Sequence, residues 1–448
     1  MRARGGSVAY AQGQQSMTSE HMRDIVPTAD TILVVGGGIS GLTAAVEAAE
    51  CGKRVILVEK SATLGGRTPL LYRYFPKLCH PTCGLEINLR RLKGNPDIRV
   101  LTMAEVTAIA GRRGDYTVTV KIAPRYVNEN CTACGACADA VGMTVPDASN
   151  YGLGRVKAAH LPHDMAYPER YVLDPALIGT PDADQAKAAC RYGAIDLDMK
   201  ETTAQLSVGA IVWATGWRPY DAARIHPYGY GRYANVLTSL EFERLADPHG
   251  PTRGKLARPS DGAAANNIAF IQCAGSRDEN HLRHCSRICC MATLKQTQYV
   301  REARGDDARS TVYYIDIRAI DRFEDFYQRV RKDPNVKFVK SKVARIEQGA
   351  NGNLVLHGVD TEGAKRYAAE HDLVVLAIGM EPSVRAADVP ADVIGDSSGF
   401  LEDRPGTGIF AAGCAAGPLD VNRSAQHATA AVMHALQVVN RAAGSEVS

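Results

Sequence analysis

Cysteines carry the clearest chemical signal in this 448-residue chain. Three of the twelve stand at C-x2-C-x2-C spacing in CTACGACADAV, and four lie within FIQCAGSRDENHLRHCSRICC, two of them adjacent. Cysteines in a reducing compartment seldom form structural disulfides, so clustered thiols indicate metal binding or redox work. The first group is Cys131, Cys134 and Cys137, and the second is Cys273, Cys285, Cys289 and Cys290.

The first group has the spacing that wraps three thiolates around one iron–sulfur cubane. The fourth cysteine of the bacterial-ferredoxin pattern is missing, because Val141 occupies that position and no proline follows. In a two-cluster ferredoxin that cysteine binds the other cluster, so its loss predicts that only one cluster remains. Farther along, AACRYGAIDLD keeps Cys190 before the strand that normally follows the last ligand. We expect Cys190 to complete a 4Fe-4S cluster with Cys131, Cys134 and Cys137.

Other interpretations of this first group stay open. A zinc knuckle or unloaded cysteines fit the same spacing, although three thiolates without a nearby histidine suit iron–sulfur better than zinc. If Cys190 were a buried core thiol, the three remaining cysteines would hold a cluster with one open iron.

Composition excludes several classes of function. The 52 basic and 49 acidic residues give a net charge of only +3, so nothing suggests a nucleic-acid partner. Hydrophobic residues make up 45% of the chain, enough for two or three cores. No stretch reaches the roughly 18–20 apolar residues of a membrane span. The N-terminus lacks the apolar core of a signal peptide, so we expect a cytoplasmic protein with a flexible tail over residues 1–28.

A dinucleotide-binding βαβ unit is predicted from TILVVGGGISGLTAAVEAAECGKRVILVEK, a strand, a glycine-rich turn, a helix and a second strand ending in an acid. Gly36 permits the tight turn, Gly38 lets the backbone approach a pyrophosphate, and Gly41 lets helix and strand pack closely. Glu59 lies 21 residues past Gly38, where an acid accepts hydrogen bonds from an adenosine ribose.

Three later motifs select the type of dinucleotide. GGR at 65–67 follows the acid, GAIVWATGWRP at 209–219 is a strand ending in an ATG turn, and TGIFAAGC at 407–414 is a late strand ending at a glycine. Together they resemble the FAD-dependent two-dinucleotide-domain oxidoreductases of the glutathione and thioredoxin reductase class, over residues 31–440. The resemblance implies an α/β fold and FAD contacts from Gly36, Gly38, Ser40, Gly41, Glu59, Lys60, Gly66, Arg67, Ala214, Thr215, Gly216, Gly413, Cys414 and Asp420.

One departure from that class concerns the ribityl chain of FAD. Its members usually end the late strand with Gly-Asp, whereas here Cys414 follows Gly413. The sequence therefore leaves open how the ribityl hydroxyls are held, with Asp420 as the candidate substitute for the missing acid.

The second dinucleotide domain departs further from the pattern. It should begin at NIAFIQC, but the turn that follows, from Cys273 to Asp278, has one glycine and an Arg-Asp pair. A pyrophosphate lacks a close backbone approach there, so we expect no nicotinamide nucleotide. Cys285 and Cys289 would share a face of the following helix, whereas Cys290 points about 100° away. One cofactor bound to both adjacent cysteines needs a helix that starts there with an irregular turn.

The same segments resemble the A subunit of heterodisulfide reductase, an FAD and iron–sulfur electron-transfer protein. FIQCAGSRD, HCSRICCMATLK, TVYYIDIRAIDRFEDFYQRV and GIFAAGCAAGPLD carry the resemblance, and FPKLCHPTC, CTACGACA and YGAIDLD agree with it. A zinc site using His281 or His284 and a redox-active dithiol are the alternatives for the second cysteine group. The resemblance implies instead a 4Fe-4S cluster beside the flavin, held by Cys273, Cys285, Cys289 and Cys290.

Three further residues are candidates for catalysis. The resemblance implies that Lys295 approaches the flavin N5 region, where a cation favours reduced, anionic flavin. The alternative is an exposed helical lysine. Cys79 and Cys83 lie in a proline-bearing loop near the expected flavin, as a redox pair, as extra ligands or as idle thiols.

The resemblance, together with these patterns, implies an oxidoreductase subunit that carries FAD and two 4Fe-4S clusters and acts on sulfur groups. The chain looks like the short form in the sulfur-oxidising heterodisulfide-reductase-like complex, which implies B-like and C-like partner subunits. We also expect a homodimer. The competing hypothesis is a self-sufficient NAD(P)H-dependent flavin disulfide reductase that uses Cys79 and Cys83. A non-enzymatic iron–sulfur scaffold or sensor is the third.

The predicted organisation interrupts the FAD-binding domain twice. A ferredoxin-like α+β module is inserted first, and a second dinucleotide-like domain that carries the cysteine site follows. The expected segments are a tail at 1–28, FAD-binding parts at 29–123, 201–262 and 386–448, the inserted module at 124–200 and the second domain at 263–385.

Overall fold

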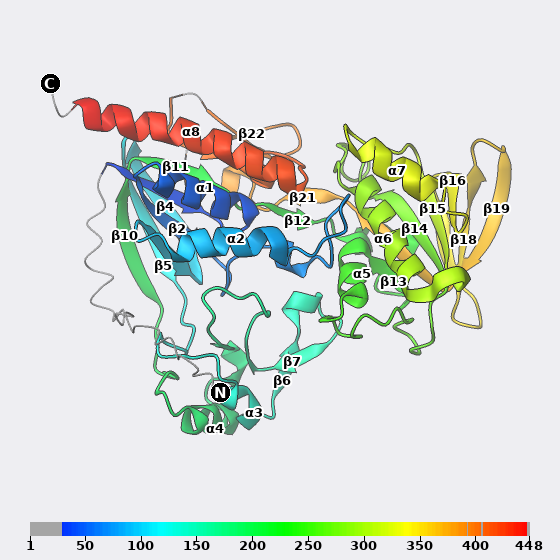
Figure 1. Cartoon of the computed structure of the whole chain (residues 1–448), viewed down its shortest axis with the longest axis horizontal. Helices are drawn as coiled ribbons and strands as arrows, with labels where there is room; N and C mark the ends of the chain where they lie inside the picture. Colours follow the sequence, from blue (N-terminus) through cyan, green and yellow to red (C-terminus); the bar gives the residue numbers. More distant parts are fainter. Residues whose placement is uncertain (1–28, 392, 405, 446–448) are drawn as a thin grey trace, which may run out of the picture.

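The computed structural model describes residues 29–391, 393–404 and 406–445, and the expected tail at 1–28 lies outside them. Two bodies, each built on a parallel sheet, lie side by side, and a smaller module packs below the junction between them (Figure 1). Within the described part of the chain, none of the helices combines the length and apolar character that crossing a bilayer demands.

The first body is a five-stranded parallel sheet covered on both faces. Alternate residues of the central strand enter opposite cores: Ile32 and Val34 face the helices, whereas Leu33 and Val35 face a second, antiparallel sheet. The parallel strands, in spatial order, are β24 (Ile409–Ala411), β11 (Ala210–Trp213), β1 (Thr31–Val35), β2 (Arg54–Glu59) and β3 (Ile98–Thr102). The helices are α1 (Ile39–Glu50), α2 (Thr82–Lys93) and α8 (Val421–Ser445), and the antiparallel strands are β10 (Thr202–Val208), β5 (Asp115–Ile122) and β4 (Ala104–Arg112).

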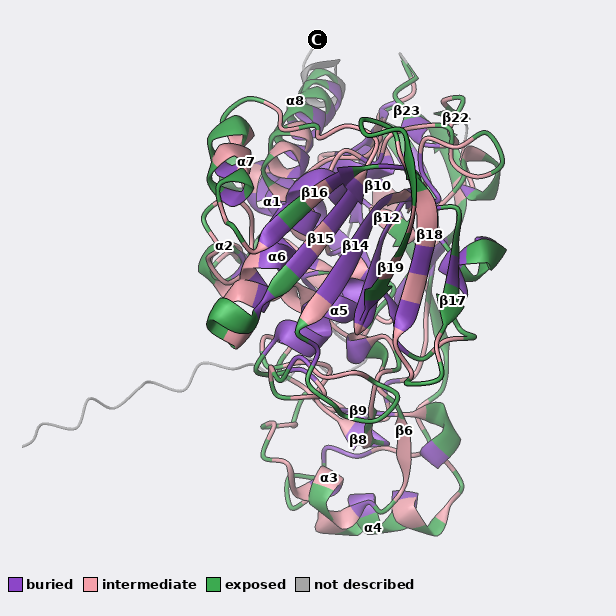
Figure 2. Cartoon of the chain, turned by 90° about the vertical axis from the view of Figure 1, so that its right-hand side faces the viewer, coloured by how far each residue is buried: buried purple, intermediate pink, exposed green. Residues whose placement is uncertain are grey.

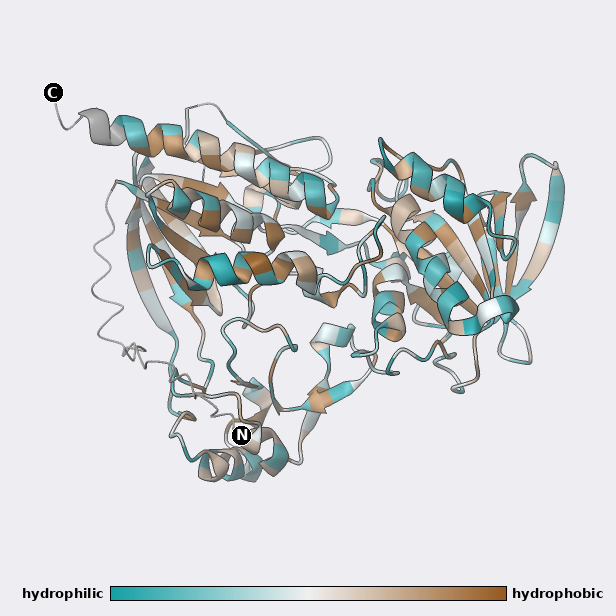
Figure 3. Cartoon of the chain, viewed as in Figure 1, coloured by the Kyte–Doolittle hydropathy of each residue, from teal (hydrophilic) through white to brown (hydrophobic). Residues whose placement is uncertain are grey.

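The second body repeats this plan. Its parallel strands are β13 (Val236–Thr238), β20 (Leu373–Ile378), β14 (Asn267–Ala274), β15 (Arg309–Tyr314) and β16 (Val336–Lys340). One face carries α5 (Ser239–Ala246), α6 (Cys289–Arg304) and α7 (Phe323–Arg331), and the other carries β17 (Arg345–Gln348), β18 (Leu354–Asp360) and β19 (Lys365–His371). Figure 2 shows β14 as a largely buried central strand, and Figure 3 shows hydrophobic residues along the strands of both sheets.

The inserted module occupies the chain between β5 and β10. Its small core is its own, formed by residues such as Val127, Leu173 and Leu177. Short elements build it: α3 (Ala136–Ala140), β6 (Thr144–Pro146), β7 (Arg155–Lys157), β8 (Ala159–His160), β9 (Val172–Leu173) and α4 (Pro181–Ala189). Because these elements are short, their loops set the positions of its side chains.

Two strands join the large bodies, β12 (Trp217–Pro219) and its antiparallel partner β21 (Met380–Pro382). The boundary differs from the one expected at residue 263, since β13 already pairs with β20 in the second sheet. A three-residue strand paired with a distant one leaves no local signal. The remaining short elements are β22 (Ile394–Gly395), β23 (Leu401–Glu402) and the 3₁₀ helices Thr68–Leu70, Ala148–Asn150, Pro175–Leu177, Ala222–Arg224, His226–Tyr228, Gly305–Asp307, Ala386–Asp388 and Gly413–Ala415.

Candidate functional site

The turn between β1 and α1 needs its glycines for different reasons. A Cβ on Gly36 would lie 2.4 Å from the carbonyl oxygen of Ala214, and one on Gly41 would lie 1.7 Å from that of Gly36. Gly38 differs, because a Cβ there would meet nothing closer than the Cα of Gly66, at 3.9 Å. The backbone at Gly38 therefore faces open space at a helix N-terminus, where a pyrophosphate can approach.

Glu59 stands beside this turn at the end of β2. Its carboxylate is buried and accepts hydrogen bonds from the Gly37 N–H at 2.6 Å and the Ser61 N–H at 2.7 Å. These bonds fix an acid where the fold places the ribose of a bound dinucleotide. Lys60, assigned to the cofactor from sequence, instead forms an exposed ion pair with Glu105 at 2.8 Å. The structure thus gives the Lys60 side chain no part in the turn.

Several other residues predicted to contact the cofactor lie around the same turn. Arg67 donates from Nε to the carbonyl oxygen of Trp217 at 3.1 Å, which places it beside the end of the ATG segment. The Thr215 hydroxyl in that segment is buried without a hydrogen-bond partner among the described residues. Gly413 is packed so closely that a Cβ would lie 1.9 Å from the Ser40 hydroxyl. An open glycine backbone, a fixed acid and an orphaned hydroxyl fit a dinucleotide such as FAD.

Cys414 stands at the position where the glutathione and thioredoxin reductase class usually has the acid that holds the ribityl chain. The Cys414 thiol is buried and lies 3.3 Å from the carbonyl oxygen of Leu419, to which it donates, and burial raises its pKa. Asp420 accepts a hydrogen bond from the Arg423 N–H at 3.0 Å and faces the Arg423 guanidinium at 3.7 Å, at the start of α8. Asp420 is therefore engaged at the end of a helix, which weakens its case as the substitute acid.

All four cysteines expected to hold the first cluster line one cavity in the inserted module. Cys137 lies in α3, and Cys190 ends α4. Burial raises the pKa of the Cys137 thiol to about 11, whereas the backbone N–H of Ala136 lowers the pKa of the exposed Cys134. The loop and two helix ends thus bring distant thiols together, with one edge of the set at the surface.

The donor set of this cavity suits a cluster better than a single ion. Four thiolates around one zinc stand only about 3.8 Å apart, since each Zn–S bond is about 2.3 Å. Among the described residues, no three His, Cys, Asp or Glu side chains are arranged to hold one metal ion. A cubane spreads its ligands farther apart, and its thiolates prefer apolar walls such as Val127, Tyr171 and Ile195.

The second group of cysteines collects at the carboxyl end of β14. The pairing of β14 with β20 shifts register between Ile271 and Ala274, and Cys273 adopts a left-handed conformation with φ of 56°. Such a bulge turns a side chain out of the strand pattern. The helix α6 begins at Cys289, the position that binding of both adjacent cysteines to one cofactor requires. Strand end and helix start therefore face each other across this group.

Burial and mutual proximity dominate the electrostatics of this second group. Burial raises the pKa of Cys290 to about 12 and that of Cys289 well above its usual value, and the nearby Cys273 and Cys285 raise both further. Buried thiols hold their protons until a metal replaces them, since iron binds cysteine as thiolate. The group therefore suits a tightly bound metal cofactor better than a reactive dithiol.

Each histidine proposed for the zinc alternative makes a hydrogen bond through one ring nitrogen. The Nδ1 atom of His281 forms a 2.6 Å hydrogen bond with the Tyr220 hydroxyl, and the Nε2 atom of His284 lies 2.9 Å from the carbonyl oxygen of Met380. These contacts occupy one ring nitrogen of each residue. The other ring nitrogen of each residue remains available, and metal-bound histidines usually hold such a second contact, so the zinc alternative stays open.

The turn after β14 is packed by side chains, whereas the turn after β1 leaves its backbone open at Gly38. A Cβ on Gly275 would lie 2.4 Å from the Tyr220 ring, which is fully buried against it. Arg277 forms a two-armed ion pair with Asp316, which follows β15, and one arm measures 3.1 Å. The pair bridges the ends of neighbouring strands, where a dinucleotide would enter. Sequence predicted the missing glycines but neither Tyr220 nor Asp316.

Lys295 is buried, so the exposed-lysine alternative is wrong. Its ammonium pairs with Glu243 at 2.8 Å and donates to the carbonyl oxygen of Arg73 at 2.7 Å. Glu243 also accepts from the Tyr299 hydroxyl at 3.0 Å and the Tyr72 N–H at 3.1 Å. This hub, which sequence analysis missed, ties α5 and α6 to the loop that leads to Cys79. Glu243 is the second of two glutamates in SLEFERLA, and it belongs to no motif that could have revealed the hub.

Cys79 and Cys83 lie in and after that loop as free thiols. Cys79 is half-buried, and Cys83 is exposed in the first turn of α2. Burial raises the pKa of Tyr74, and both cysteines add to that increase, so both lie near its ring. The two positions remain available for redox work, and no disulfide joins them in the described part of the chain.

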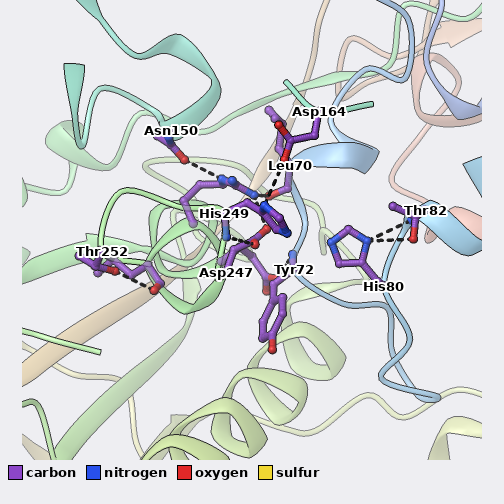
Figure 4. Close-up of polar contacts among 12 residues, drawn as sticks. Leu70, Tyr72, His80, Thr82, Asn150, Asp164, Asp247, His249 and Thr252 are labelled. Carbon is purple, nitrogen blue, oxygen red and sulfur yellow. Dashed lines mark hydrogen bonds and ion pairs between the residues drawn. The ribbon is translucent and has the colours of Figure 1, made fainter. Parts of the chain in front are cut away.

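Arg244 locks the three parts of the molecule together near this loop. Its buried guanidinium donates to Asn150 of the inserted module at 2.8 Å, to the carbonyl oxygen of Leu70 at 3.3 Å and to Asp247 at 2.7 Å. Figure 4 shows Asn150, Leu70 and Asp247 converging at this junction, with His80 and Thr82 beside it. The flavin-side loop, the module and the second body are thus held in register.

Known proteins share the fold and the first turn. Residues 31–70 match the family model described as FAD dependent oxidoreductase. Thioredoxin reductases from T. acidophilum and Lactococcus lactis each superpose with a TM-score of 0.50, at 12% and 14% identity. The matches cover 91% and 92% of this chain and 98% and 99% of theirs. They confirm the predicted α/β fold with two dinucleotide-binding-type domains.

Closer relatives are found among curated sequences. The second iron–sulfur A subunit of CoB–CoM heterodisulfide reductase from Methanopyrus kandleri is 38% identical over 433 residues, 92% of this chain and 64% of the relative. The A subunit of the H(2):CoB-CoM heterodisulfide,ferredoxin reductase of Methanothermobacter marburgensis is 34% identical over 91% of this chain and 63% of its own length. The A subunit of a Methanosarcina acetivorans heterodisulfide reductase is 34% identical over 91% of this chain and 53% of its own length.

The chain thus spans between about half and two thirds of the length of these relatives. The match runs through nearly the whole described region, and the name of the Methanopyrus kandleri relative includes the iron–sulfur character predicted from the cysteines. Over the region that it shares with them, the chain is similar to the A subunits of heterodisulfide reductases.

Proposed function

We propose that this chain is an FAD and iron–sulfur electron-transfer subunit of a heterodisulfide-reductase-like complex. It passes electrons between flavin and a thiol/disulfide site on partner subunits. The observation that carries the proposal is the arrangement of two four-cysteine groups in the same molecule as an open glycine turn with a fixed acid. Electron transfer needs such a series of cofactor sites, whereas a scaffold does not need the flavin turn.

The residues divide the task between binding and positioning. The open backbone at Gly38 lets the pyrophosphate of FAD approach, and the Glu59 carboxylate accepts hydrogen bonds from the ribose hydroxyls. Each four-cysteine group holds one 4Fe-4S cluster, and the flavin and clusters together supply the one- and two-electron chemistry. Burial of Cys289 and Cys290 keeps water away from these two members of the second group. Lys295 supplies a hydrogen-bond donor on the flavin side, with its charge largely neutralised by Glu243.

The second turn argues against a self-sufficient NAD(P)H-dependent disulfide reductase. Tyr220 and the Arg277–Asp316 ion pair occupy the nucleotide entrance. Cys79 and Cys83 then lack a hydride source on the same chain. We therefore place the disulfide chemistry on partner subunits that resemble the B and C proteins, as the names of the relatives suggest for an assembly with several subunits.

The setting of the complex is part of the proposal. We propose a cytoplasmic homodimer that works in sulfur oxidation. All twelve cysteines are free thiols, which agrees with a reducing compartment.

Anaerobic purification followed by flavin and iron quantification tests the proposal. We expect one FAD and about eight iron atoms per chain, the content of two 4Fe-4S clusters. Titration with NADH or NADPH should leave the flavin absorbance unchanged. Stoichiometric bleaching at micromolar nucleotide, or disulfide turnover by the isolated chain at a physiological rate, would instead support the self-sufficient reductase.

A further inference from the structure

The buried side chain of Gln272 has an unexplained free donor. Gln272 lies in the bulge of β14, beside Cys273, and is 5% exposed. Its Nε2 atom is buried and has no hydrogen-bond partner in the described part of the chain. An unsatisfied buried polar group costs about 1–3 kcal/mol, so few persist in native proteins without a reason.

The opposite end of the same strand shows the usual arrangement. Asn267 donates from Nδ2 to the carbonyl oxygen of Glu370 at 2.8 Å, and its Oδ1 lies 3.0 Å from Nδ1 of His371. Both ends of that amide are satisfied by protein. Gln272 instead stands at the carboxyl end of a parallel strand, where ligands of open α/β sheets bind. Its free donor therefore stands at the edge where a bound cofactor would lie.

The partner of the Gln272 carbonyl indicates what that group is. The Cys290 thiol donates to Oε1 of Gln272 over 3.2 Å. A cysteine that binds iron does so as thiolate, so this proton is then absent and the carbonyl oxygen faces a negative sulfur. Turning the amide about its last bond presents Nε2 to the sulfur over the same separation. The N–H group that lacks a partner in the free protein thereby gains one in the cluster-bound protein.

We propose that Gln272 donates an amide hydrogen bond to the Cys290 sulfur of a bound 4Fe-4S cluster and so raises the reduction potential of that cluster. The inference rests on the proposed function, because it needs a cluster at the second cysteine group. Hydrogen bonds to ligand sulfur stabilise the more negative, reduced state and shift the potential upward. The Arg318 N–H, 3.4 Å from the same sulfur, already contributes one such donor. Gln272 is thus a positioning residue that tunes the electron acceptor.

Substitution of Gln272 by leucine, which removes both N–H donors, tests this role. Redox titration of the anaerobic holoprotein, followed by electron paramagnetic resonance, should show two iron–sulfur components. The component that Cys290→Ser removes belongs to the second group, and the other serves as an internal control. We expect Gln272→Leu to move only the component that Cys290→Ser removes to a more negative potential. The iron content should stay unchanged. Pulsed measurements after exchange into D₂O should lose one exchangeable deuteron coupling from that component.

A second variant, Gln272→Met, keeps the chain length without a donor and should give the same negative shift if leucine disturbs cluster assembly. An unchanged potential and deuteron coupling in the iron-replete variants would overturn the role of Gln272 alone. If the parent and the Cys290→Ser variant gave the same electron paramagnetic resonance components, the second cluster would be overturned, and with it both proposals.

Discussion

The two parallel sheets of this molecule present the same strand–turn–helix unit with opposite contents. In the first body, the turn after β1 leaves the backbone at Gly38 open, with the nearest atom 3.9 Å from an added Cβ. In the second body, the turn after β14 is packed by Tyr220, 2.4 Å from the Cβ position of Gly275. The crevice at the carboxyl end of the strands is therefore kept free in one body and filled in the other.

This difference shows that the fold supplies a location and the side chains decide its use. Both sheets bring a strand end, a helix start and a neighbouring strand to one edge. In the first body this edge has glycines and a fixed acid, which suit a phosphate and a ribose. In the second body the same edge has four cysteines, which suit iron. Function therefore follows from the residues at the edge rather than from the sheet.

A methyl group at Gly38 should have the largest effect. Gly38→Ala meets no protein atom within 3.9 Å and keeps an ordinary extended conformation, with φ of −72°, so the fold should persist. The added carbon occupies the space that the pyrophosphate needs. We expect flavin content to fall at least about tenfold, measured by absorbance of the released FAD.

Gly84→Ala is the matched control, because an added Cβ in that helix also meets nothing within 4 Å. It should retain full flavin, and both variants should keep the circular dichroism of the parent. Normal flavin content in Gly38→Ala would show that the first turn does not bind the cofactor.

Removal of one second-group ligand should have the next largest effect. Cys290→Ser replaces a buried thiolate by an oxygen that holds iron less well. We expect the iron content to fall by about half, the loss of one of two 4Fe-4S clusters, while flavin content stays unchanged. Iron and flavin assays on the same sample measure both.

Cys51→Ser serves as its control, since that cysteine is exposed at the end of α1, away from both groups. Full iron content in Cys290→Ser would mean that the second turn does not hold an iron–sulfur cluster through Cys290.

Much of this contrast could be predicted from local sequence. Glycine spacing revealed the first turn because each glycine answers a short-range steric need, such as the 1.7 Å approach at Gly41. Cysteine spacing likewise grouped residues whose distances along the chain reflect one cofactor. The fold class followed from the same motifs, since strand, turn and helix are contiguous.

Residues that act through long-range packing could not be found this way. Tyr220 fills the second turn from 55 positions upstream of Gly275, and Glu243 reaches Tyr72 across 171 positions. Neither belongs to a motif, and a buried glutamate looks like a surface one in sequence. The Lys60 side chain, assigned to the cofactor from sequence, pairs with Glu105 in the structure, because proximity along the chain does not fix a side chain's direction.

Substitution of a cluster ligand in the inserted module should have an intermediate effect on iron content. Cys190→Ser alters the one ligand that comes from outside the C-x2-C-x2-C run but lines the same cavity. We expect loss of about one iron per chain or conversion to a 3Fe-4S form, visible by electron paramagnetic resonance. Flavin and the second cluster should be unaffected. The parent spectrum with unchanged iron would mean that the fourth ligand is another group.

A methyl group in the second turn should have the smallest effect, and on stability instead of cofactor content. Gly275→Ala forces a side chain into a left-handed conformation, with φ of 76°, and against the Tyr220 ring. Backbone strain of about 1 kcal/mol and overpacking of about 1–3 kcal/mol should lower the free energy of unfolding. Gly52→Ala is the matched control, because its φ is 78° and its Cβ meets nothing within 4 Å. Denaturation of both variants under anaerobic conditions measures their free energies of unfolding. Both variants carry the backbone strain, but only Gly275→Ala also carries the overpacking against Tyr220. Equal destabilisation of the two would indicate that Tyr220 does not fill the turn in solution, and the nucleotide entrance would then be open in both bodies.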